Sequence, residues 1–473
     1  MKALCILLLL LMTINWNYGQ SVSVKPRVFV LTDIENEPDD AQSLVRFLTY
    51  SNQWDVEGIV STTSCWQRDK TAEWRIHEII DAYGKVRDNL EVHEKGYPTY
   101  AYMKSIVKKG VPKFGMSGVG KDQDSEGSEW LIHCLRKEDS RPLYVQAWGG
   151  ANVLAQALWK MERTLARSEL DKIIDKIRVY TISDQDDTGP WIRRNFKKVF
   201  YVVSPGYEEN GGGQYHYATW SGISGDKFHG RFSGPDFTIV DNPWLDQHIR
   251  QNHGPLGAQH PQTEYLMEGD SPSFLGLINN GLNNPERPDF GGWGGRYELY
   301  IPAFKKYMYE PEVRPIWTDA QDEVWSEITQ EYHTSNHATI WRWREAYQHD
   351  FAARIDWSNT TKYSEANHPP VIKLGHANEI SVQAGEKVTL IGTATDPDGN
   401  SLSYEWIHYK EVGTLNASRR NWMELEHADQ AVTSFTAPEV ARVKTAHLIL
   451  AVTDDGEPSL TRYQRVIVNI LSD

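Results

Sequence analysis

The chain has 473 residues, of which 24% are charged and 40% are hydrophobic, and this balance is typical of a globular protein with roughly two or three domains. Its formal net charge is −15 at pH 7 and no basic stripe appears along it, which argues against nucleic acid as a partner. The 18 tryptophans and 23 tyrosines are many for this length, and such side chains either stack on sugar rings or fill cores.

Residues 1–20 have the parts of a secretory signal peptide. Lys2 gives the positive start, residues 3–12 form an apolar core, and small and polar residues lead to a cleavage point near Gln20. The apolar core is too short to span a bilayer, and no later stretch is long enough. We therefore expect a secreted or periplasmic protein with no membrane span.

Two cysteines remain after removal of the signal peptide, Cys65 and Cys134. Export permits a disulfide between them, but the sequence does not establish one. We expect two buried free thiols and keep the disulfide as the open alternative.

An acidic stretch follows an apolar run over residues 28–31. The run predicts a buried strand, and the apolar spacing from Ala41 onward predicts a helix with Pro38 in its first turn. The turn between them carries five acidic residues in eight positions: Asp33, Glu35, Glu37, Asp39 and Asp40. This is the carboxyl end of a strand, where open α/β sheets bind ligands. Because five carboxylates on one turn repel one another, a divalent cation such as Ca²⁺ is the simplest remedy, and a solvated acidic loop is the alternative.

Strands and helices alternate over the first half of the chain. Strands are predicted over 56–62, 143–148, 176–182 and 199–203, and helices over 71–86, 125–135 and 152–162. On the first of these helices, Trp74 is expected on the same packed side as Ile76 and Ile79. The alternation predicts an α/β fold, with a mostly parallel sheet and helices on both faces.

The second half of this domain has a different amino-acid composition. Residues 205–300 are rich in Gly, Asn, His and aromatics, as functional loops often are. Residues 315–350 return to a helical pattern, and we expect their four tryptophans to pack as a helix core: Trp317, Trp325, Trp341 and Trp343.

A double proline at 369–370 marks a linker. Short strand-like runs follow over 371–374, 387–390, 402–406, 447–450 and 465–468, with turn signals between them. This spacing predicts an all-β, immunoglobulin-like sandwich of about a hundred residues. We expect an α/β domain over 21–365 and the sandwich over 366–473.

The turn over 394–399 and the segment Tyr404-Glu405-Trp406 resemble cadherin-like and polycystic-kidney-disease-type modules of secreted carbohydrate enzymes. The pair Asp396 and Asp398 either binds Ca²⁺ or simply forms the turn.

Other strand ends supply further candidate site residues. Trp148 and Asn152 flank a Gly-Gly turn, which either contributes to the site or lets the helix approach the sheet. Asp270 precedes Ser-Pro and an apolar run, so it is a site residue or a helix N-cap. Three more candidates are Asp186 after the fourth strand, Asn210 before a glycine run, and Trp293 as an aromatic platform in a loop.

The frame Asp33-Ile34-Glu35-Asn36-Glu37-Pro38-Asp39-Asp40-Ala41 resembles the nucleoside hydrolase signature Asp-x-Asp-Pro-Gly-x-Asp-Asp-Ala. Four positions match, Glu35 replaces an aspartate, and the Pro-Gly pair is not kept. More closely, the chain resembles secreted nucleoside-hydrolase-like proteins that are described as cellulose-binding and carry a C-terminal immunoglobulin-like domain.

This resemblance implies a role for each of the candidate site residues. It assigns water activation to Asp39, and it assigns Ca²⁺ ligation to Glu35, Asp40, Asp270 and, loosely, the carbonyl of Trp148. Asp33 would support the metal, while Asn36 and Glu37 would narrow the sugar pocket. Gly269 stands where these hydrolases have a histidine that helps the nucleobase leave. This difference argues against nucleoside cleavage.

The leading hypothesis is a secreted, Ca²⁺-dependent glycoside hydrolase that cleaves a plant or algal glycan or glycoside. The first alternative is a non-catalytic carbohydrate-binding protein, binding cellulose for example, on the same fold. A third hypothesis, nucleoside scavenging, follows from the fold alone. The expected partner is a carbohydrate, and the sequence leaves the sugar and the oligomeric state open.

Overall fold

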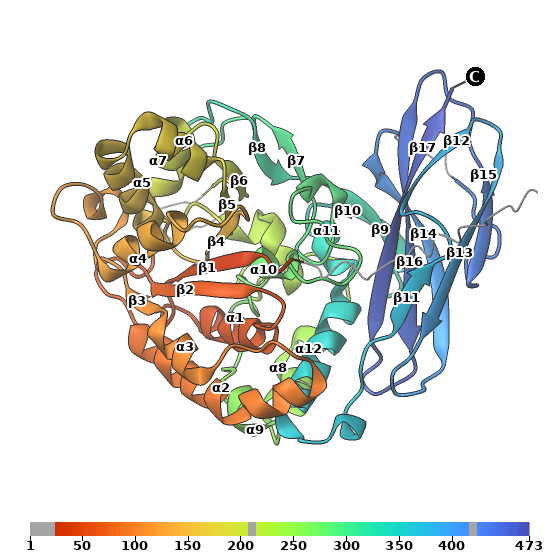
Figure 1. Ribbon diagram of the computed structural model, residues 1–473, viewed down its shortest axis with the longest axis horizontal. Helices are drawn as coiled ribbons and strands as arrows, with labels where there is room; N and C mark the ends of the chain where they lie inside the picture. Colours follow the sequence, from red (N-terminus) through yellow and green to blue (C-terminus); the bar gives the residue numbers. More distant parts are fainter. Residues whose placement is uncertain (1–23, 207–213, 416–422, 473) are drawn as a thin grey trace, which may run out of the picture.

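The computed structural model describes residues 24–206, 214–415 and 423–472. An α/β part is followed by a β-rich C-terminal part that packs against it (Figure 1). The expected signal peptide and Asn210 lie outside the described residues. Within them, none of the helices combines the length and the apolar character needed to cross a membrane.

The α/β part is built on an eight-stranded sheet with the order β3-β2-β1-β4-β5-β6-β8-β7. All neighbouring strands are parallel except β7 and β8. The strands are β1 (Arg27–Thr32), β2 (Asp55–Ser61), β3 (Val107–Lys109), β4 (Leu143–Ala147), β5 (Ile177–Thr181), β6 (Phe200–Val203), β7 (Tyr297–Tyr300) and β8 (Ile316–Asp319). The parallel pairing of these strands confirms the predicted mostly parallel sheet.

Helices cover both faces of this sheet (Figure 1). One face carries α1 (Pro38–Thr49), α2 (Glu73–His93), α3 (Tyr100–Ser105), α8 (Asn242–Leu245), α9 (Gly254–Gly257), α10 (Pro272–Leu275), α11 (Ala338–Trp341) and α12 (Arg344–Asn359). The other carries α4 (Glu126–Leu135), α5 (Asn152–Thr164), α6 (Arg167–Ile174) and α7 (Thr188–Asn195). The alternation along β1 divides the core in two, because Val28 and Val30 face the first layer while Phe29 and Leu31 face the second.

Two predictions about tryptophans are wrong. Trp74 is 53% exposed on α2, because the packed stripe of that helix begins at Ile76. The stretch 315–350 is not all helix: Trp317 lies on β8, and Trp325 lies on a hairpin of β9 (Asp322–Ser326) and β10 (Glu331–Ser335). Trp325 is exposed on this hairpin, where alternate side chains point outward.

The C-terminal part is a two-sheet sandwich with the strand orders β11-β13-β15 and β12-β17-β16-β14. Its strands are β11 (Val371–Leu374), β12 (Glu379–Gln383), β13 (Lys387–Thr395), β14 (Leu402–Gly413), β15 (Val432–Thr436), β16 (Lys444–Asp454) and β17 (Thr461–Leu471). The five predicted strands are present, β11 with the predicted bounds and the other four longer than expected, and β12 and β15 were not predicted. Asp396 accepts the backbone N–H groups of Asp398 and Asn400, so these residues do form the turn.

Cys65 and Cys134 are both buried and no disulfide joins them, as expected. Cys65 lies near Gln185, whereas Cys134 lies at the end of α4 against the carbonyl of Glu57.

Buried charges join the two parts of the chain. The carboxylate of Asp322, which is fully buried, accepts from Arg296 at 2.7 Å, Arg342 at 2.9 Å and the Tyr409 hydroxyl at 2.7 Å. Tyr409 belongs to β14, so a side chain of the sandwich completes this cluster.

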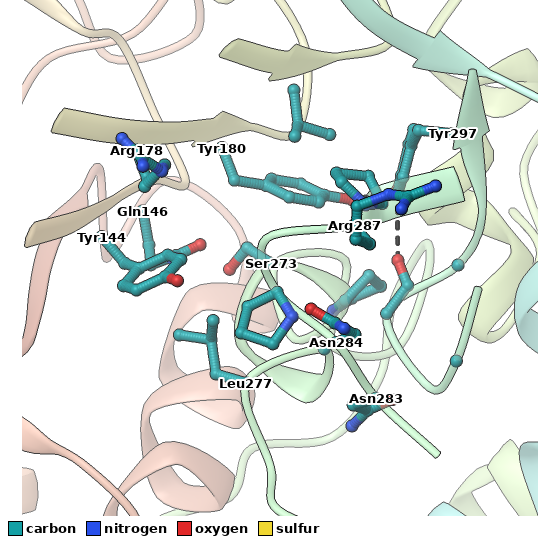
Figure 2. Close-up of a pocket in the computed structure, with 18 of the residues that line it drawn as sticks. Tyr144, Gln146, Arg178, Tyr180, Ser273, Leu277, Asn283, Asn284, Arg287 and Tyr297 are labelled. Carbon is teal, nitrogen blue, oxygen red and sulfur yellow. Dashed lines mark hydrogen bonds between the residues drawn. The ribbon is translucent and has the colours of Figure 1, made fainter. Parts of the chain in front are cut away.

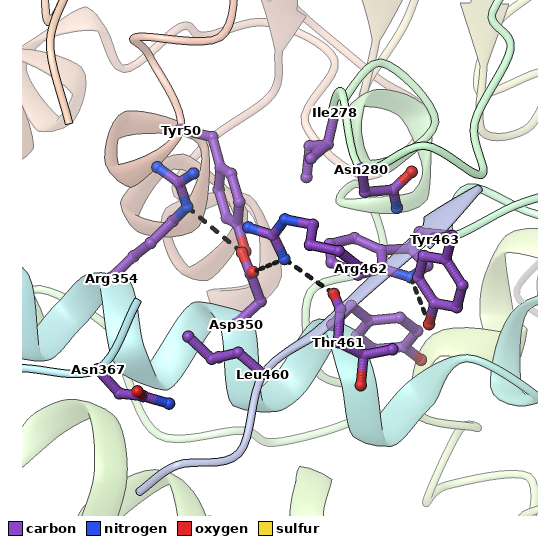
Figure 3. Close-up of polar contacts among 12 residues, drawn as sticks. Tyr50, Ile278, Asn280, Asp350, Arg354, Asn367, Leu460, Thr461, Arg462 and Tyr463 are labelled. Atoms are coloured by element: carbon purple, nitrogen blue, oxygen red, sulfur yellow. Dashed lines mark hydrogen bonds and ion pairs between the residues drawn. The ribbon is translucent and has the colours of Figure 1, made fainter. Parts of the chain in front are cut away.

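A second contact runs from β17. Arg465 donates to the carbonyls of Leu282 and Gly291, and Arg462 donates to Asp350 of α12 at 2.6 Å. Figure 3 shows Arg462 between the α/β part and its own strand. Because these groups are desolvated together, the sandwich is a fixed part of the structure rather than a loosely tethered module.

We expect Asp322→Ala to lower the free energy of unfolding by about 3 kcal/mol, because Arg296 and Arg342 lose the fully buried carboxylate that they share and keep only their pairs with Glu298 and Glu411. Urea titration followed by tryptophan fluorescence measures the change. The control is Lys387→Ala, which breaks an exposed ion pair with Glu426 and should leave the unfolding midpoint unchanged. An Asp322→Ala protein as stable as the wild type would contradict the role given to this cluster.

Candidate functional site

The acidic turn lies where the sequence places it, between β1 and α1. Asp33 follows β1 directly, and Pro38 begins α1 with Asp39 and Asp40 in its first turn. All three aspartates are buried, and the most exposed of them is Asp39, at 8%. Thr32 donates its hydroxyl to Asp40, and the backbone N–H of Gly269 approaches Asp39. The first turn of a helix favours negative charge, which suits these two side chains.

Asp270 reaches the same point from more than two hundred residues further along the chain. One carboxylate oxygen from each of Asp39, Asp40 and Asp270 lies within 4.8 Å of the others. Both carboxylate oxygens of Asp270 are buried without a hydrogen-bond partner, as is one oxygen each of Asp39 and Asp33. Buried oxygens of this kind are costly unless a proton or a cation satisfies them. This buried Asp triad therefore fits a metal ion.

Burial dominates the electrostatics of this cluster. It raises the pKa of Asp33 to about 7 and that of Glu37 to about 9, with the neighbouring carboxylates adding to both shifts. Burial also raises the pKa of Asp39 to about 6, although hydrogen bonds from backbone N–H groups oppose the shift. The pKa values of Asp40 and Asp270 lie well above their usual range for the same reason, with repulsion from nearby carboxylates second. In the absence of a cation, the cluster therefore holds protons near neutral pH.

An ion pair anchors the loop that carries Asp270. Glu268 is fully buried and has a left-handed backbone, with φ of 52°. Its carboxylate accepts from Arg46 of α1, from His260 at 3.0 Å and from the hydroxyl of Ser271 at 2.9 Å. The pKa of Glu268 is lowered, because Arg46 and His260 outweigh the effect of burial. Nothing in the sequence pattern marked this network, because Arg46 occupies an ordinary helical position.

Aromatic side chains form the walls above the acids. The carboxylates and these rings line one pocket. Beside Asp33, Glu37, Asp39, Asp40 and Asp270 it is lined by Pro38, Trp66, Trp148, Ile182, Ser183, Gln185, Tyr215, Trp220, Tyr265 and Leu266. Trp66 and Tyr265 are exposed at 42% and 43%, while Trp220 is buried. Tyr215, Trp220 and Tyr265 come from the aromatic-rich stretch 205–300, and Trp148 was a predicted site residue, whereas no signal in the sequence marked Trp66.

Several predicted site residues also border this pocket. Glu37 lines it and accepts a hydrogen bond from the Asn36 amide at 3.0 Å. The carbonyl of Trp148 accepts from the Gln185 amide at 2.6 Å. Asp186 is fully buried, and burial raises its pKa to about 7. Its charge acts on Asp33, so it belongs to the same acidic region.

Three other predicted residues lie elsewhere. Glu35 has a left-handed backbone, with φ of 73°, and its carboxylate pairs with Arg75 at 3.2 Å instead of joining the triad. Asn152 donates to Thr63 and to the carbonyl of Lys113, so it holds loops together behind the pocket. Trp293 is fully buried between the two parts of the chain, where it packs against Tyr463, so it offers no surface platform.

Gly269 leaves no space for a side chain. A Cβ built there would lie 2.7 Å from the carboxylate of Asp39 and 2.7 Å from the ring of Trp220. Trp220 is held by a hydrogen bond from its indole to Ser183 at 3.0 Å. The space a histidine would need is thus already filled.

Comparisons with known proteins agree with this architecture. Residues 27–297 match the family "Cellulose-binding Sde182, nucleoside hydrolase-like domain", and residues 387–470 match "Cellulose-binding protein Sde0182, C-terminal domain". No curated protein matches the chain.

One solved structure is similar over most of its length. It is a nucleoside hydrolase-related hypothetical protein from Saccharophagus degradans that is associated with carbohydrate metabolism. It is 34% identical, covers 94% of this chain and 100% of its own, and has a TM-score of 0.78.

Two other solved structures are more distant. The polycystic-kidney-disease domain of the KIAA 1837 protein is 22% identical, covers 22% of this chain and 88% of its own, and has a TM-score of 0.16. The type III effector XopQ, complexed with adenosine diphosphate ribose, is 10% identical, covers 72% and 95%, and has a TM-score of 0.30. These scores are too low to bear on function. The match over 27–297 and the 34% identity over nearly the whole chain place this protein in the nucleoside hydrolase-like family of cellulose-binding proteins.

Proposed function

We propose that this protein is an exported, Ca²⁺-dependent glycoside hydrolase that acts on a terminal sugar unit of a plant or algal glycan or glycoside. The observation that supports this is the convergence of unpartnered, buried carboxylate oxygens at the base of a pocket with aromatic walls. Carboxylates and a cation suit sugar hydroxyls, and aromatic faces suit the apolar faces of sugar rings. A pocket closed at its base favours a chain end over the middle of a polymer.

The donor atoms of the site fit a hard cation. Asp40 and Asp270 would hold Ca²⁺, with Asp33 and the carbonyl of Trp148 beside them, because these groups offer oxygen and no nitrogen or sulfur. Glu35 is left out, since its carboxylate pairs with Arg75. When bound, Ca²⁺ supplies positive charge that lowers the pKa of a coordinated water.

Asp39 has the position of a general base. Its Oδ1 has no partner in the described structure, while Oδ2 lies toward the N–H of Gly269. A carboxylate so oriented accepts a proton from water as the water attacks the anomeric carbon. The pKa of Asp39 is about 6 without the cation, and a bound cation would lower it further, so Asp39 would be ionised at neutral pH. The other buried carboxylates stabilise the positive charge that develops on the sugar ring.

The same geometry disfavours nucleoside cleavage. The resemblance would place a histidine for the departing base at Gly269, and Trp220 occupies that space. The Trp220 ring contributes stacking but no proton to the leaving group, so the pocket suits a sugar whose leaving group does not need that histidine.

A carbohydrate-binding protein without turnover is the second candidate. The cellulose-binding description of the matched family favours it. The two candidates differ at Asp39, because binding needs no proton acceptor beside the cation.

Without divalent cations, we expect the protein to lose stability as the pH rises from about 5 to about 8. The raised pKa values of Asp33, Asp39 and Glu37 mean that the folded state keeps protons that the unfolded state has released, so rising pH favours unfolding. Melting temperatures measured in chelator across this range test the expectation. Asp40→Asn, which removes one charge from the cluster, should flatten the profile. A wild-type melting point that rises with pH would contradict it.

We expect Ca²⁺ to raise the melting temperature at about pH 8 more than at about pH 5, since the cation competes with protons for the same oxygens. Calorimetry of the wild type, with and without Ca²⁺ after chelation, measures the gain. Asp270→Asn should lose most of it, whereas Asp396→Asn, in the turn of the sandwich, should keep it. An identical melting point with and without Ca²⁺ would exclude calcium binding.

We expect Asp39→Asn to lower the rate of sugar release from an active glycan by at least about a hundredfold, the scale of one general base, while sugar and Ca²⁺ binding persist. The assay is release of reducing sugar from a panel of plant and algal glycans. Asp186→Asn serves as the control for general loss of charge, with a smaller effect. If the wild type cleaves no member of the panel but binds some, the binding candidate replaces the enzyme.

A further inference from the structure

A second cavity lies on the sheet, apart from the acidic pocket. It opens over β4, β5 and β6, on a part of the sheet that residues 272–297 cover with loops instead of a long helix (Figure 2). Its lining comes from these strands and from the loops of residues 272–297. None of Asp33, Asp39, Asp40 or Asp270 lines it.

The walls of this cavity are mainly apolar. Four aromatic rings contribute to them: Tyr144 from β4, Tyr180 from β5, Phe200 from β6 and Tyr297 from β7. Val202, Leu277 and three prolines complete the apolar surface. An enclosure of this composition favours a flat, largely apolar ring, because aromatic side chains stack on such rings or meet them edge to face.

Charged groups at the mouth are neutralised by neighbours. Arg178 pairs with Glu286 at 2.9 Å, and Arg287 pairs with Asp289 at 2.6 Å. Glu286 also accepts the hydroxyl of Tyr144 at 2.6 Å. With each cation paired to its own carboxylate, the cavity offers no free charge to attract an ion, so the ligand is uncharged.

The polar groups inside are also mostly satisfied. Tyr180 and Tyr297 share a hydrogen bond through their hydroxyls, and Tyr297 also contacts the carbonyl of Gly294 at 3.2 Å. Ser273 donates to the carbonyl of Asp270 at 2.6 Å and accepts from the Trp148 indole at 2.9 Å. A hexose would bring several hydroxyl groups and find few partners, at a cost for each unsatisfied one.

Gln146 is the exception. It is 1% exposed, it lines the cavity, and its Oε1 has no hydrogen-bond partner among the described residues. A buried amide oxygen without a donor costs free energy that a ligand hydroxyl can recover. The cavity thus combines apolar walls with one unmet acceptor.

We propose that this cavity is a second binding site, and that its ligand is an uncharged phenol-like ring whose hydroxyl donates to Gln146. The site does not depend on the proposed hydrolase activity. It borders the acidic pocket through Ser273, whose hydroxyl ties Trp148 to Asp270, so an occupant contacts a residue that shapes both cavities.

Gly276 allows the cavity to be blocked without strain. It lines the cavity, its φ is −70°, and a Cβ there would have only the Cα of Gly294 nearby, at 3.8 Å. Gly276→Leu therefore places a side chain in the cavity in a backbone conformation that leucine adopts readily. Gly276→Ala adds only a methyl group and is the matched control.

The test uses 4-ethylphenol, which is uncharged at neutral pH, and follows its binding to the full chain by saturation-transfer NMR. We expect binding to the wild type and to Gly276→Ala, and at least about tenfold weaker binding to Gly276→Leu. Gln146→Leu should weaken 4-ethylphenol by about tenfold while leaving ethylbenzene, which lacks the hydroxyl, nearly unchanged. Circular dichroism and Tb³⁺ luminescence of the Gly276→Leu protein check that the fold and the acidic site are intact.

Two results would overturn the proposal. One is no 4-ethylphenol binding by the wild type, or equal binding by the wild type and Gly276→Leu. The other is displacement of 4-ethylphenol by glucose, which would make the ligand a sugar. The proposed hydrolase fails separately, since its tests are Ca²⁺ stabilisation and sugar release.

Discussion

The ion pair between Arg46 and Glu268 is the contact on which the acidic site depends. Helix α1 carries Asp39 and Asp40 in its first turn and Arg46 two turns later. One helix therefore presents two of the carboxylates and, through Arg46, also binds Glu268 in the loop that carries Asp270. Glu268 keeps a left-handed backbone two residues before Asp270. Such a backbone costs about 1–3 kcal/mol and persists where surrounding contacts fix it. The ion pair of Glu268 thus fixes the loop that holds the unpartnered carboxylate oxygens of Asp270 close to those of Asp39 and Asp40.

Much of this arrangement follows from local sequence. The apolar run before Asp33, the proline at 38 and the helical spacing after Ala41 fix the strand, turn and helix, and strand ends in a parallel sheet meet at one edge. The positions of Asp39 and Asp40 are therefore predictable, whereas Asp270 follows no strand and was expected here only from the resemblance to nucleoside hydrolases. The direction of Glu35 is not predictable, because it depends on a left-handed residue and on Arg75, which belongs to α2.

The remaining differences arise from long-range packing. The aromatic walls of the acidic pocket come from loops, where no period in the sequence marks which side chain turns inward. Trp293 lies in such a loop, and its burial depends on Tyr463 of the sandwich, a partner that arrives 170 residues later. Trp317 and Trp325 lie on strands of two different sheets, so their spacing along the chain does not reflect a helix.

The tight packing at Gly269 constrains how this pocket can change during evolution. A histidine at 269 collides with Trp220, while a smaller residue at 220 alone leaves a void and removes the hydrogen bond to Ser183. A Cβ at 269 also lies 2.6 Å from Leu266 and 2.7 Å from Asp39, so a smaller residue at 220 does not by itself make room, and the positions are epistatic. A lineage with this pair is separated from one with the histidine by a fitness valley, and single mutations do not carry it across.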